Sequence, residues 1–167
     1  MKRRLHAVPI LILLAGCSPQ HDDGFVPLFN GRNLDGWVGD TTGYVVEDGT
    51  MKARLPRPGE PAPGNIYTAD EYDDFVLRFQ FNLTPGANNG LGIRAPLEGD
   101  AAYVGIELQI IDNQDERWAH LKPWQYHGSA YGIAAAERGF LPPPGEWNRQ
   151  QATIDGRRIE VVLNDHV

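Results

Sequence analysis

The amino-acid sequence predicts an all-β protein, an antiparallel β-sandwich or jelly roll, on three observations. Apolar and polar residues alternate in short runs, which is the pattern of strands with one buried face. The chain holds 19 glycines and 13 prolines, and many of them fall between these runs as turn signals. No long stretch repeats its apolar residues every 3.6 positions, so helical crossovers between parallel strands are not expected.

Seven runs carry the strand pattern. They are residues 44–46, 50–53, 75–81, 90–94, 103–111, 152–154 and 158–163. The dipeptides Asp48-Gly49 and Asp155-Gly156 favour tight hairpins between neighbouring runs. Apolar residues at every second position from Phe75 to Phe81 predict a strand with one buried face.

Three other segments depart from the strand pattern. Residues 56–64 are rich in proline and predict a surface loop. Residues 113–126 are polar and aromatic, with one or two helical turns expected near 115–121, and a loop this long in a compact sandwich is often functional. Residues 163–167 resemble a strand that enters a turn, so we expect either a sandwich that lacks C-terminal strands or one that leaves a sheet edge open.

The N-terminus has the features of an export signal. Residues 1–16 combine three basic residues with an apolar run at 8–14, which is too short to span about 30 Å of hydrocarbon. Leu14-Ala15-Gly16-Cys17 resembles a bacterial lipobox, so we expect Cys17 to be lipidated and residues 17–23 to tether a domain at 24–167. An ordinary signal peptide with an incidental cysteine is the alternative. The prediction is an exported protein held at the cell-envelope membrane by its lipid.

Composition limits the cofactors and binding partners that we expect. Cys17 is the single cysteine, which excludes an internal disulfide and a cysteine-based zinc site. Removing the three basic residues of the signal from the chain's 15 basic and 22 acidic residues leaves a net charge of −10. An acidic domain repels phosphate backbones, so nucleic acid is not an expected partner, whereas neutral sugars remain candidates.

The clearest candidate for chemistry is the strand expected at 103–111. Glu107 and Gln109 share one face, while Ile106, Leu108 and Ile110 share the other and are expected to face the core. A β-bulge near residues 110–111 would bring Asp112 onto the face of Glu107. Two carboxylates on one concave sheet face are typical of acid–base chemistry on a sugar. The alternative is a polar face that simply meets water.

Further candidates lie nearby in the sequence. His127 stands among aromatic residues and glycines, which favours a cleft wall, where it could serve as base, acid or metal ligand; a structural histidine is the alternative. Arg94 could anchor a sugar oxygen, hold Glu107, or form a structural salt bridge. Aromatic residues that could stack on a sugar ring or cap the core are Trp124, Tyr126 and Tyr131. A divalent metal ion is a candidate cofactor. The spacing of the histidines, however, matches no known metal-binding motif.

Several phrases in one order resemble the bacterial 3-keto-disaccharide hydrolase domain family. They are residues 25–37 (Phe-Val-Pro-Leu-Phe-Asn-Gly-Arg-Asn-Leu-Asp-Gly-Trp), 65–68, 75–79, 90–94 (Gly-Leu-Gly-Ile-Arg), 107–112 (Glu-Leu-Gln-Ile-Ile-Asp), 126–132 and 145–148. The resemblance runs from about residue 24 to the end. It implies a β-sandwich similar to concanavalin A-like lectins and glucanases, and members are commonly exported, often as lipoproteins. Family domains usually continue through more strands after the turn at 163–165.

The resemblance implies cleavage of glycosides already oxidised at C3. A C3 ketone acidifies the C2 hydrogen, a base removes it, the enolate expels the C1 substituent, and water adds later. We expect Glu107 or His127 to be the base, Arg94 or a divalent metal to stabilise the enolate, and Asp112 to be a ligand or the acid. Gln109 would bind sugar hydroxyls.

Other functions remain open at this point. A non-catalytic carbohydrate-binding module would need the aromatic residues but not Glu107, Asp112 and His127 together. A retaining endo-glucanase is less favoured because Gln109 stands where a central acid is usual. A surface scaffold protein is a third alternative, but no feature of the sequence specifically supports it.

Overall fold

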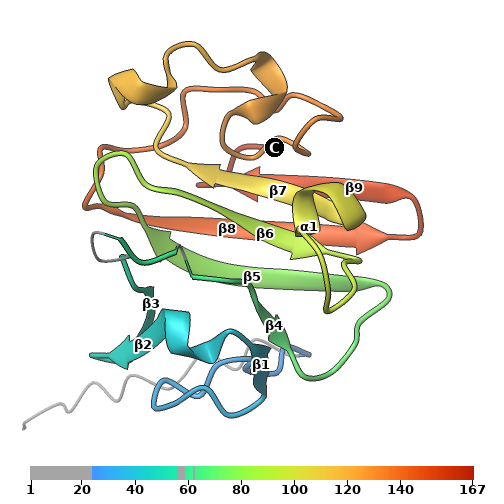
Figure 1. Ribbon diagram of the computed structural model, residues 1–167. Coiled ribbons are helices and arrows are strands. Elements are labelled where there is room, and N and C mark those ends of the chain that lie inside the picture. Colours follow the sequence, from blue (N-terminus) through green and yellow to red (C-terminus); the bar gives the residue numbers. More distant parts are fainter. Residues whose placement is uncertain (1–23, 56–58, 62) are drawn as a thin grey trace, which may run out of the picture.

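The computed structural model describes residues 24–55, 59–61 and 63–167 (Figure 1). Its strands are β1 (Trp37–Gly39), β2 (Tyr44–Glu47), β3 (Thr50–Ala53), β4 (Ile66–Thr68), β5 (Phe75–Asn82), β6 (Asn88–Ile93), β7 (Ile106–Ile111), β8 (Trp147–Asp155) and β9 (Arg158–Leu163). One four-residue helix, α1 (Ala101–Val104), and three short 3-10 turns complete the described elements: η1 (Thr41–Gly43), η2 (Glu116–Trp118) and η3 (Pro123–Gln125). Every strand pair is antiparallel, so the all-β sandwich prediction is confirmed.

Two layers form the body of the molecule. One is the sheet β5-β8-β9, and the other is the β6-β7 pair. The segment at residues 128–131 extends the second layer along the free edge of β7. Gly128 N–H donates to the Gln109 carbonyl, and Gln109 N–H donates to the Ser129 carbonyl. Tyr131 N–H donates to the backbone carbonyl of Glu107. Strand β7 is therefore hydrogen-bonded on both sides.

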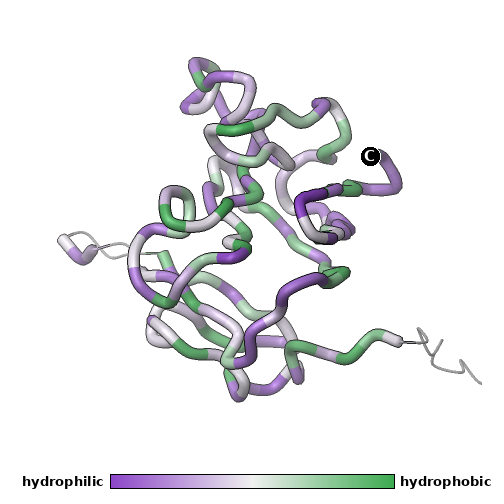
Figure 2. Tube along the Cα trace, turned by 90° about the vertical axis from the view of Figure 1, so that its right-hand side faces the viewer, coloured by the Kyte–Doolittle hydropathy of each residue, from purple (hydrophilic) through white to green (hydrophobic). Residues whose placement is uncertain are grey.

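The apolar core lies between these layers. Ile93 and Leu108 of the β6-β7 pair pack against Ala152 and Ile154 of β8, and Leu108 is fully buried. The alternation that places these residues inward also sends their neighbours outward. Hydrophobic and hydrophilic residues follow one another in short stretches along the chain (Figure 2). Ile106 packs against the core beside Leu108, as the sequence predicted.

Both predicted Asp-Gly hairpins are present. Strands β2 and β3 pair through Glu47 and Thr50, and both turn residues, Asp48 and Gly49, have positive φ angles of 50° and 73°. This combination is the tight hairpin geometry that Asp-Gly favours. Strands β8 and β9 are also joined by a two-residue turn, but Asp155 pairs with Arg158, so its central residues are Gly156 and Arg157, and Gly156 has the positive φ angle, 52°.

The strand expected at 103–111 starts later than predicted. Tyr103 and Val104 belong to α1, because the Asp100 side chain accepts a hydrogen bond from Ala102 N–H and caps a helical turn there. The expected bulge near 110–111 is also absent, since β6 and β7 pair without interruption from Ile93–Ile106 to Asn88–Ile111. The helical turns expected within 113–126 are present as η2 and η3.

The expected signal segment 1–16, the lipidation site Cys17 and the tether at 17–23 lie outside the described residues. Within the part that the structure describes, no helix has the length and apolar character needed to cross a membrane. Lipidation at Cys17 therefore stays a prediction from the sequence.

Replacing Leu108 by alanine should lower the free energy of unfolding by about 2–5 kcal/mol, because it opens a cavity between the two layers. Urea titration followed by fluorescence measures the change. The control is Val76→Ala on the exposed face of β5, which should stay within about 0.5 kcal/mol of the parent. Equal effects of the two substitutions would contradict this placement of the core.

Candidate active site

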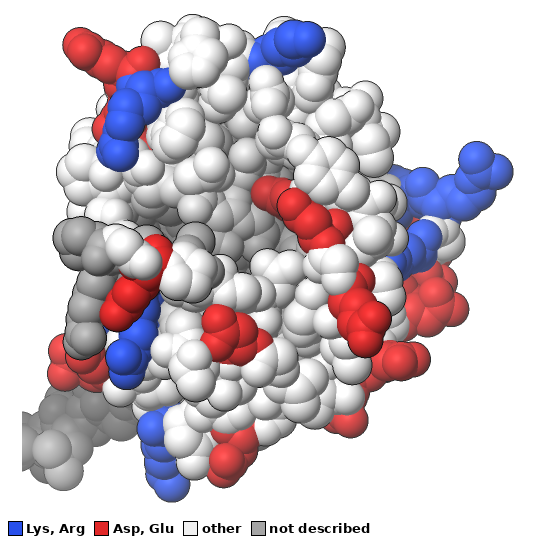
Figure 3. Space-filling view, in the orientation of Figure 1, with Lys and Arg blue, Asp and Glu red and all other residues white. Residues whose placement is uncertain are grey.

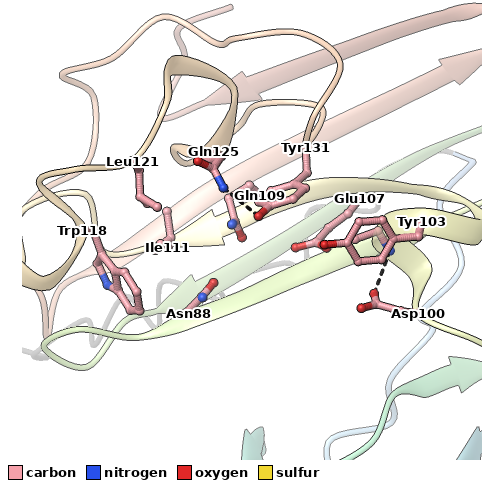
Figure 4. Close-up of a pocket in the computed structure, with 11 residues that line it drawn as sticks. Asn88, Asp100, Tyr103, Glu107, Gln109, Ile111, Trp118, Leu121, Gln125 and Tyr131 are labelled. Carbon is pink, nitrogen blue, oxygen red and sulfur yellow. Dashed lines mark hydrogen bonds between the residues drawn. The ribbon is translucent and has the colours of Figure 1, made fainter.

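A cleft of about 180 Å³ lies on the face of the β6-β7 pair that points away from the core (Figure 4). Strands β6 and β7 form its floor, and the α1 region and the 113–131 segment form its walls. Its lining residues are Asn88, Asp100, Ala102, Tyr103, Glu107, Gln109, Ile111, Trp118, Leu121, Gln125 and Tyr131. Acidic side chains lie near the centre of this face, over the β7 and α1 region, while most basic side chains lie toward its margins (Figure 3).

Gly90 of β6 makes room for the Glu107 side chain of β7, whereas Gly92 makes room for Ala101 of α1. Glu107 is paired across the strands with Gly92, and Gln109 with Gly90. A Cβ atom on Gly90 would lie 2.2 Å from Glu107 Oε1 and 2.5 Å from its Cδ and Cγ. The carboxylate therefore lies flat over the backbone of β6, in a space that only glycine leaves open.

The electrostatic environment of Glu107 favours its protonated form. Burial in the cleft raises the pKa of Glu107 above 4.5, and the nearby negative charge of Asp100 raises it further. Asp100 is held in place by its hydrogen bond from Ala102 N–H, 3.0 Å long, at the start of α1. A carboxyl group with a raised pKa exchanges protons more readily near neutral pH than an exposed one.

Two hydrogen-bond donors face the same cleft. Gln109 Oε1 accepts from Ile110 N–H at 2.9 Å, which leaves the Nε2 amide of Gln109 free to donate. Gln125 Nε2 donates to the Tyr131 hydroxyl at 2.8 Å, so the phenolic proton of Tyr131 remains available for another acceptor. A base and two donors therefore share one small space.

His127 does not line this cleft, and the cleft-wall expectation is wrong. Only 2% of His127 is exposed, and its ring stacks on Phe81 with centroids 5.1 Å apart. Nε2 lies 3.0 Å from Gln150 Oε1, and Nδ1 accepts from Ile111 N–H at 3.4 Å, so both ring nitrogens are used inside the protein. Burial lowers the pKa of His127 to about 4, against the opposing hydrogen bond to Gln150.

Asp112 and Arg94 also lie away from Glu107. Because no bulge interrupts β7, Asp112 keeps the parity of the opposite face, where it is buried and accepts hydrogen bonds from Gly86 N–H and Gln114 N–H. It closes the turns at the end of β7. Arg94 forms an ion pair with Asp74 at 3.3 Å, which is the structural alternative that the sequence left open.

The three aromatic candidates separate in the structure. Tyr131 lines the cleft, as expected for a substrate-binding residue. Trp124 is 38% exposed outside the cleft, beside Lys122. Tyr126 is buried, with its hydroxyl donating to the Trp118 carbonyl and Arg138 stacked on its ring. Neither Trp124 nor Tyr126 lines the cleft.

Sequence reasoning missed several cleft residues from the loops. Asp100, Trp118 and Gln125 come from segments without strand alternation, where spacing does not predict direction. Tyr103 was expected at the start of the strand at 103–111, but it belongs to α1. Asn88 is the exception, because it shares the parity of Gly90 and Gly92 on β6 and could have been assigned to their face.

The cleft offers two carboxylates to the candidate divalent metal. Glu107 and Asp100 supply carboxylate oxygens, which hard cations prefer. Across residues 24–55, 59–61 and 63–167, however, no three His, Cys, Asp or Glu side chains converge into a metal-binding group. The residues described do not form a metal centre by themselves.

The fold and the cleft together define a β-sandwich protein with a small polar cleft on one outer sheet face. The chain belongs to the family of the 3-keto-alpha-glucoside-1,2-lyase-like domain, whose model matches residues 24–167. The resemblance noted in the sequence is thereby confirmed.

A named relative and solved structures agree with this membership. A 3-keto-disaccharide hydrolase of Bacteroides thetaiotaomicron is 25% identical over 176 residues, covering 89% of this chain and 61% of the relative. Two crystal structures from Parabacteroides distasonis, each named "putative glycosyl hydrolase", superpose with a TM-score of 0.70. They are 30% and 28% identical, covering 84% and 82% of this chain and 68% and 66% of theirs. The chain thus spans about two thirds of the length of these relatives.

The buried histidine should make stability depend on pH. The pKa of His127 is about 4 in the folded protein and 6.5 when unperturbed, so below pH 6.5 the unfolded chain binds a proton that the folded chain does not. The free energy of unfolding should therefore fall as the pH falls from about 6.5 to 4, by about 3 kcal/mol in total. Urea titrations at pH 7 and pH 4.5 measure this. His127→Gln should remove this contribution, whereas His120→Gln, at an exposed position, should retain it.

Proposed function

We propose that this protein cleaves the glycosidic bond of sugars that carry a ketone at C3. The observation that carries the proposal is Glu107, a partly buried carboxyl with a raised pKa that shares its cleft with the donors Gln109 and Tyr131. The names of the family and of its Bacteroides relative support the same substrate class. The substrate is a carbohydrate small enough for one ring to enter the cleft.

The chemistry proceeds by elimination and then hydration. Glu107 removes the proton from C2, and the electron pair forms an enolate with its negative charge on the C3 oxygen. The enolate then collapses to the C3 ketone as a C1–C2 double bond forms, the C1–O bond breaks, and the leaving alcohol takes up a proton. Water adds across C1–C2, its hydroxyl to C1 and its proton to C2. The sum is hydrolysis of the glycosidic bond.

The cleft residues suit the charges that develop in this sequence. A base works best when its pKa lies close to the working pH, and burial moves Glu107 in that direction. The Gln109 amide and the Tyr131 hydroxyl can donate to the enolate oxygen, or Tyr131 can protonate the leaving group. Arg94, Asp112 and His127 take no part, because their polar atoms bond elsewhere in the protein.

Replacing Glu107 by glutamine should lower kcat by roughly 10²–10⁴-fold, since the base is lost while the shape is kept. The measurement is release of the alcohol from a 3-oxo-glucoside, with the unoxidised glucoside as the parallel substrate that should not react. The kcat/KM of the parent should fall as the pH drops through the pKa of Glu107, which lies above 4.5. The control Glu98→Gln, exposed and outside the cleft, should retain activity.

The same assay run in D₂O separates elimination from direct hydrolysis. Elimination and hydration place deuterium on C2 of the product, while direct hydrolysis leaves hydrogen there. A product incubated alone corrects for spontaneous exchange beside the ketone. Cleavage of the unoxidised glucoside at an equal rate would contradict the proposal.

Replacing Gly90 by alanine should displace the Glu107 carboxylate, because the new Cβ would lie 2.2 Å from Oε1. A displacement of about 1 Å at a reacting group costs roughly 100-fold in rate. We expect kcat to fall toward that extent and the acidic limb of the pH profile to shift, while circular dichroism shows an intact fold. Unchanged kcat and an unchanged pH profile would show that the carboxylate position is unimportant.

A further inference from the structure

The floor of the cleft changes from acidic to apolar along its length. Three residue pairs across β6 and β7 make up the floor: Gly92 with Glu107, Gly90 with Gln109, and Asn88 with Ile111. Glu107 and Ile111 lie four positions apart along β7, a distance of about 13 Å, so the floor is longer than one sugar ring requires. The end beyond Gln109 is therefore available to a second chemical group.

The walls repeat this change of character. Tyr103 and Asp100 stand beside Glu107, while Trp118 and Leu121 stand beside Ile111 at the opposite end (Figure 4). Trp118 and Leu121 come from the long segment after β7, and Asn88 is the polar neighbour that Figure 4 places next to Trp118. This far end is here called the Trp118 end, consisting of Asn88, Ile111, Trp118 and Leu121.

The position of Glu107 fixes which part of the substrate reaches the Trp118 end. If Glu107 removes the C2 proton, the C1 substituent lies one carbon away. Beyond Glu107 the cleft meets the carboxylate of Asp100, whose charge repels an electron-rich leaving oxygen. In the other direction the floor continues past Gln109 to the Trp118 end. This direction is therefore the one open to the leaving group.

We infer that the Trp118 end is the leaving-group subsite and accepts an aromatic alcohol in preference to a second sugar; this inference rests on the proposed function. Ile111, Leu121 and the Trp118 ring offer an apolar surface on which an aromatic ring packs well. A second sugar would place several hydroxyls against that surface, with the Asn88 amide as one partner. Hydroxyls that lose water without a new hydrogen bond weaken binding.

Three 3-oxo-glucosides of the same anomeric configuration test this subsite. Their leaving groups are benzyl alcohol, methanol and glucose. Benzyl alcohol and methanol are alcohols of similar acidity, so their difference reports contacts with the protein rather than leaving ability. The kcat/KM for the benzyl compound should exceed that for each of the others by roughly tenfold or more.

Substitutions at the subsite should remove this preference. Trp118→Ala and Leu121→Gln should each lower kcat/KM for the benzyl substrate by roughly tenfold and change the methyl substrate by less than about twofold. Trp124→Ala is the matched control, because Trp124 is exposed a few residues away and lies outside the cleft. This substitution should leave kcat/KM for both the benzyl and the methyl substrate unchanged.

A binding measurement without turnover separates the two proposals. Unoxidised benzyl glucoside, titrated into isotope-labelled protein, should shift the indole N–H signal of Trp118, and Leu121→Gln should weaken its binding. Cleavage of the methyl and disaccharide substrates as fast as the benzyl one would overturn the subsite and leave the proposed function standing. No cleavage of any 3-oxo substrate, with binding at Trp118 intact, would overturn the proposed function alone.

Discussion

Strand β7 is the constraint on which the rest of the structure depends. Its backbone is hydrogen-bonded to β6 on one side and to residues 128–131 on the other, so its register cannot slip without breaking both sets of bonds. Because side chains alternate along a strand, the register that buries Leu108 also directs Glu107 and Gln109 into the cleft. Stability and the candidate chemistry are thus set by one choice of register.

A buried polar network holds the outer wall of the cleft against this strand. His127 bonds to Gln150 of β8 and to Ile111 of β7, and its backbone N–H donates to Asn113. Polar groups lose water when they are buried, so these bonds fix the segment in one position rather than many. Tyr131 follows four residues later, and its hydroxyl is set by Gln125 from the same segment. The histidine therefore acts as an anchor for the wall.

The sequence was informative where alternation controls direction. The hairpins at Asp48-Gly49 and Asp155-Gly156 and the opposite faces of Glu107 and Leu108 follow from local rules and were predicted. The placement of Asp112 failed because it needed a bulge, which alternation cannot reveal. His127 failed because the glycines and aromatics around it suit a wall and an interior equally well, and burial depends on packing against β5 and β8. Residue types in the loop after β7 did not reveal which of its side chains point into the cleft.

The two glycines of β6 show how the cleft is compatible with a stable sheet. Glycine weakens a strand interior because it leaves backbone freedom and packs no side chain. In β6 both glycines fall on the cleft face, whereas Leu91 and Ile93, which alternate with them, face the core and stabilise the strand. The loss is confined to the side where Glu107 needs space. A side chain at Gly90 would stabilise the strand locally but would occupy the position of the carboxylate, so the glycine is better explained by the site than by the fold.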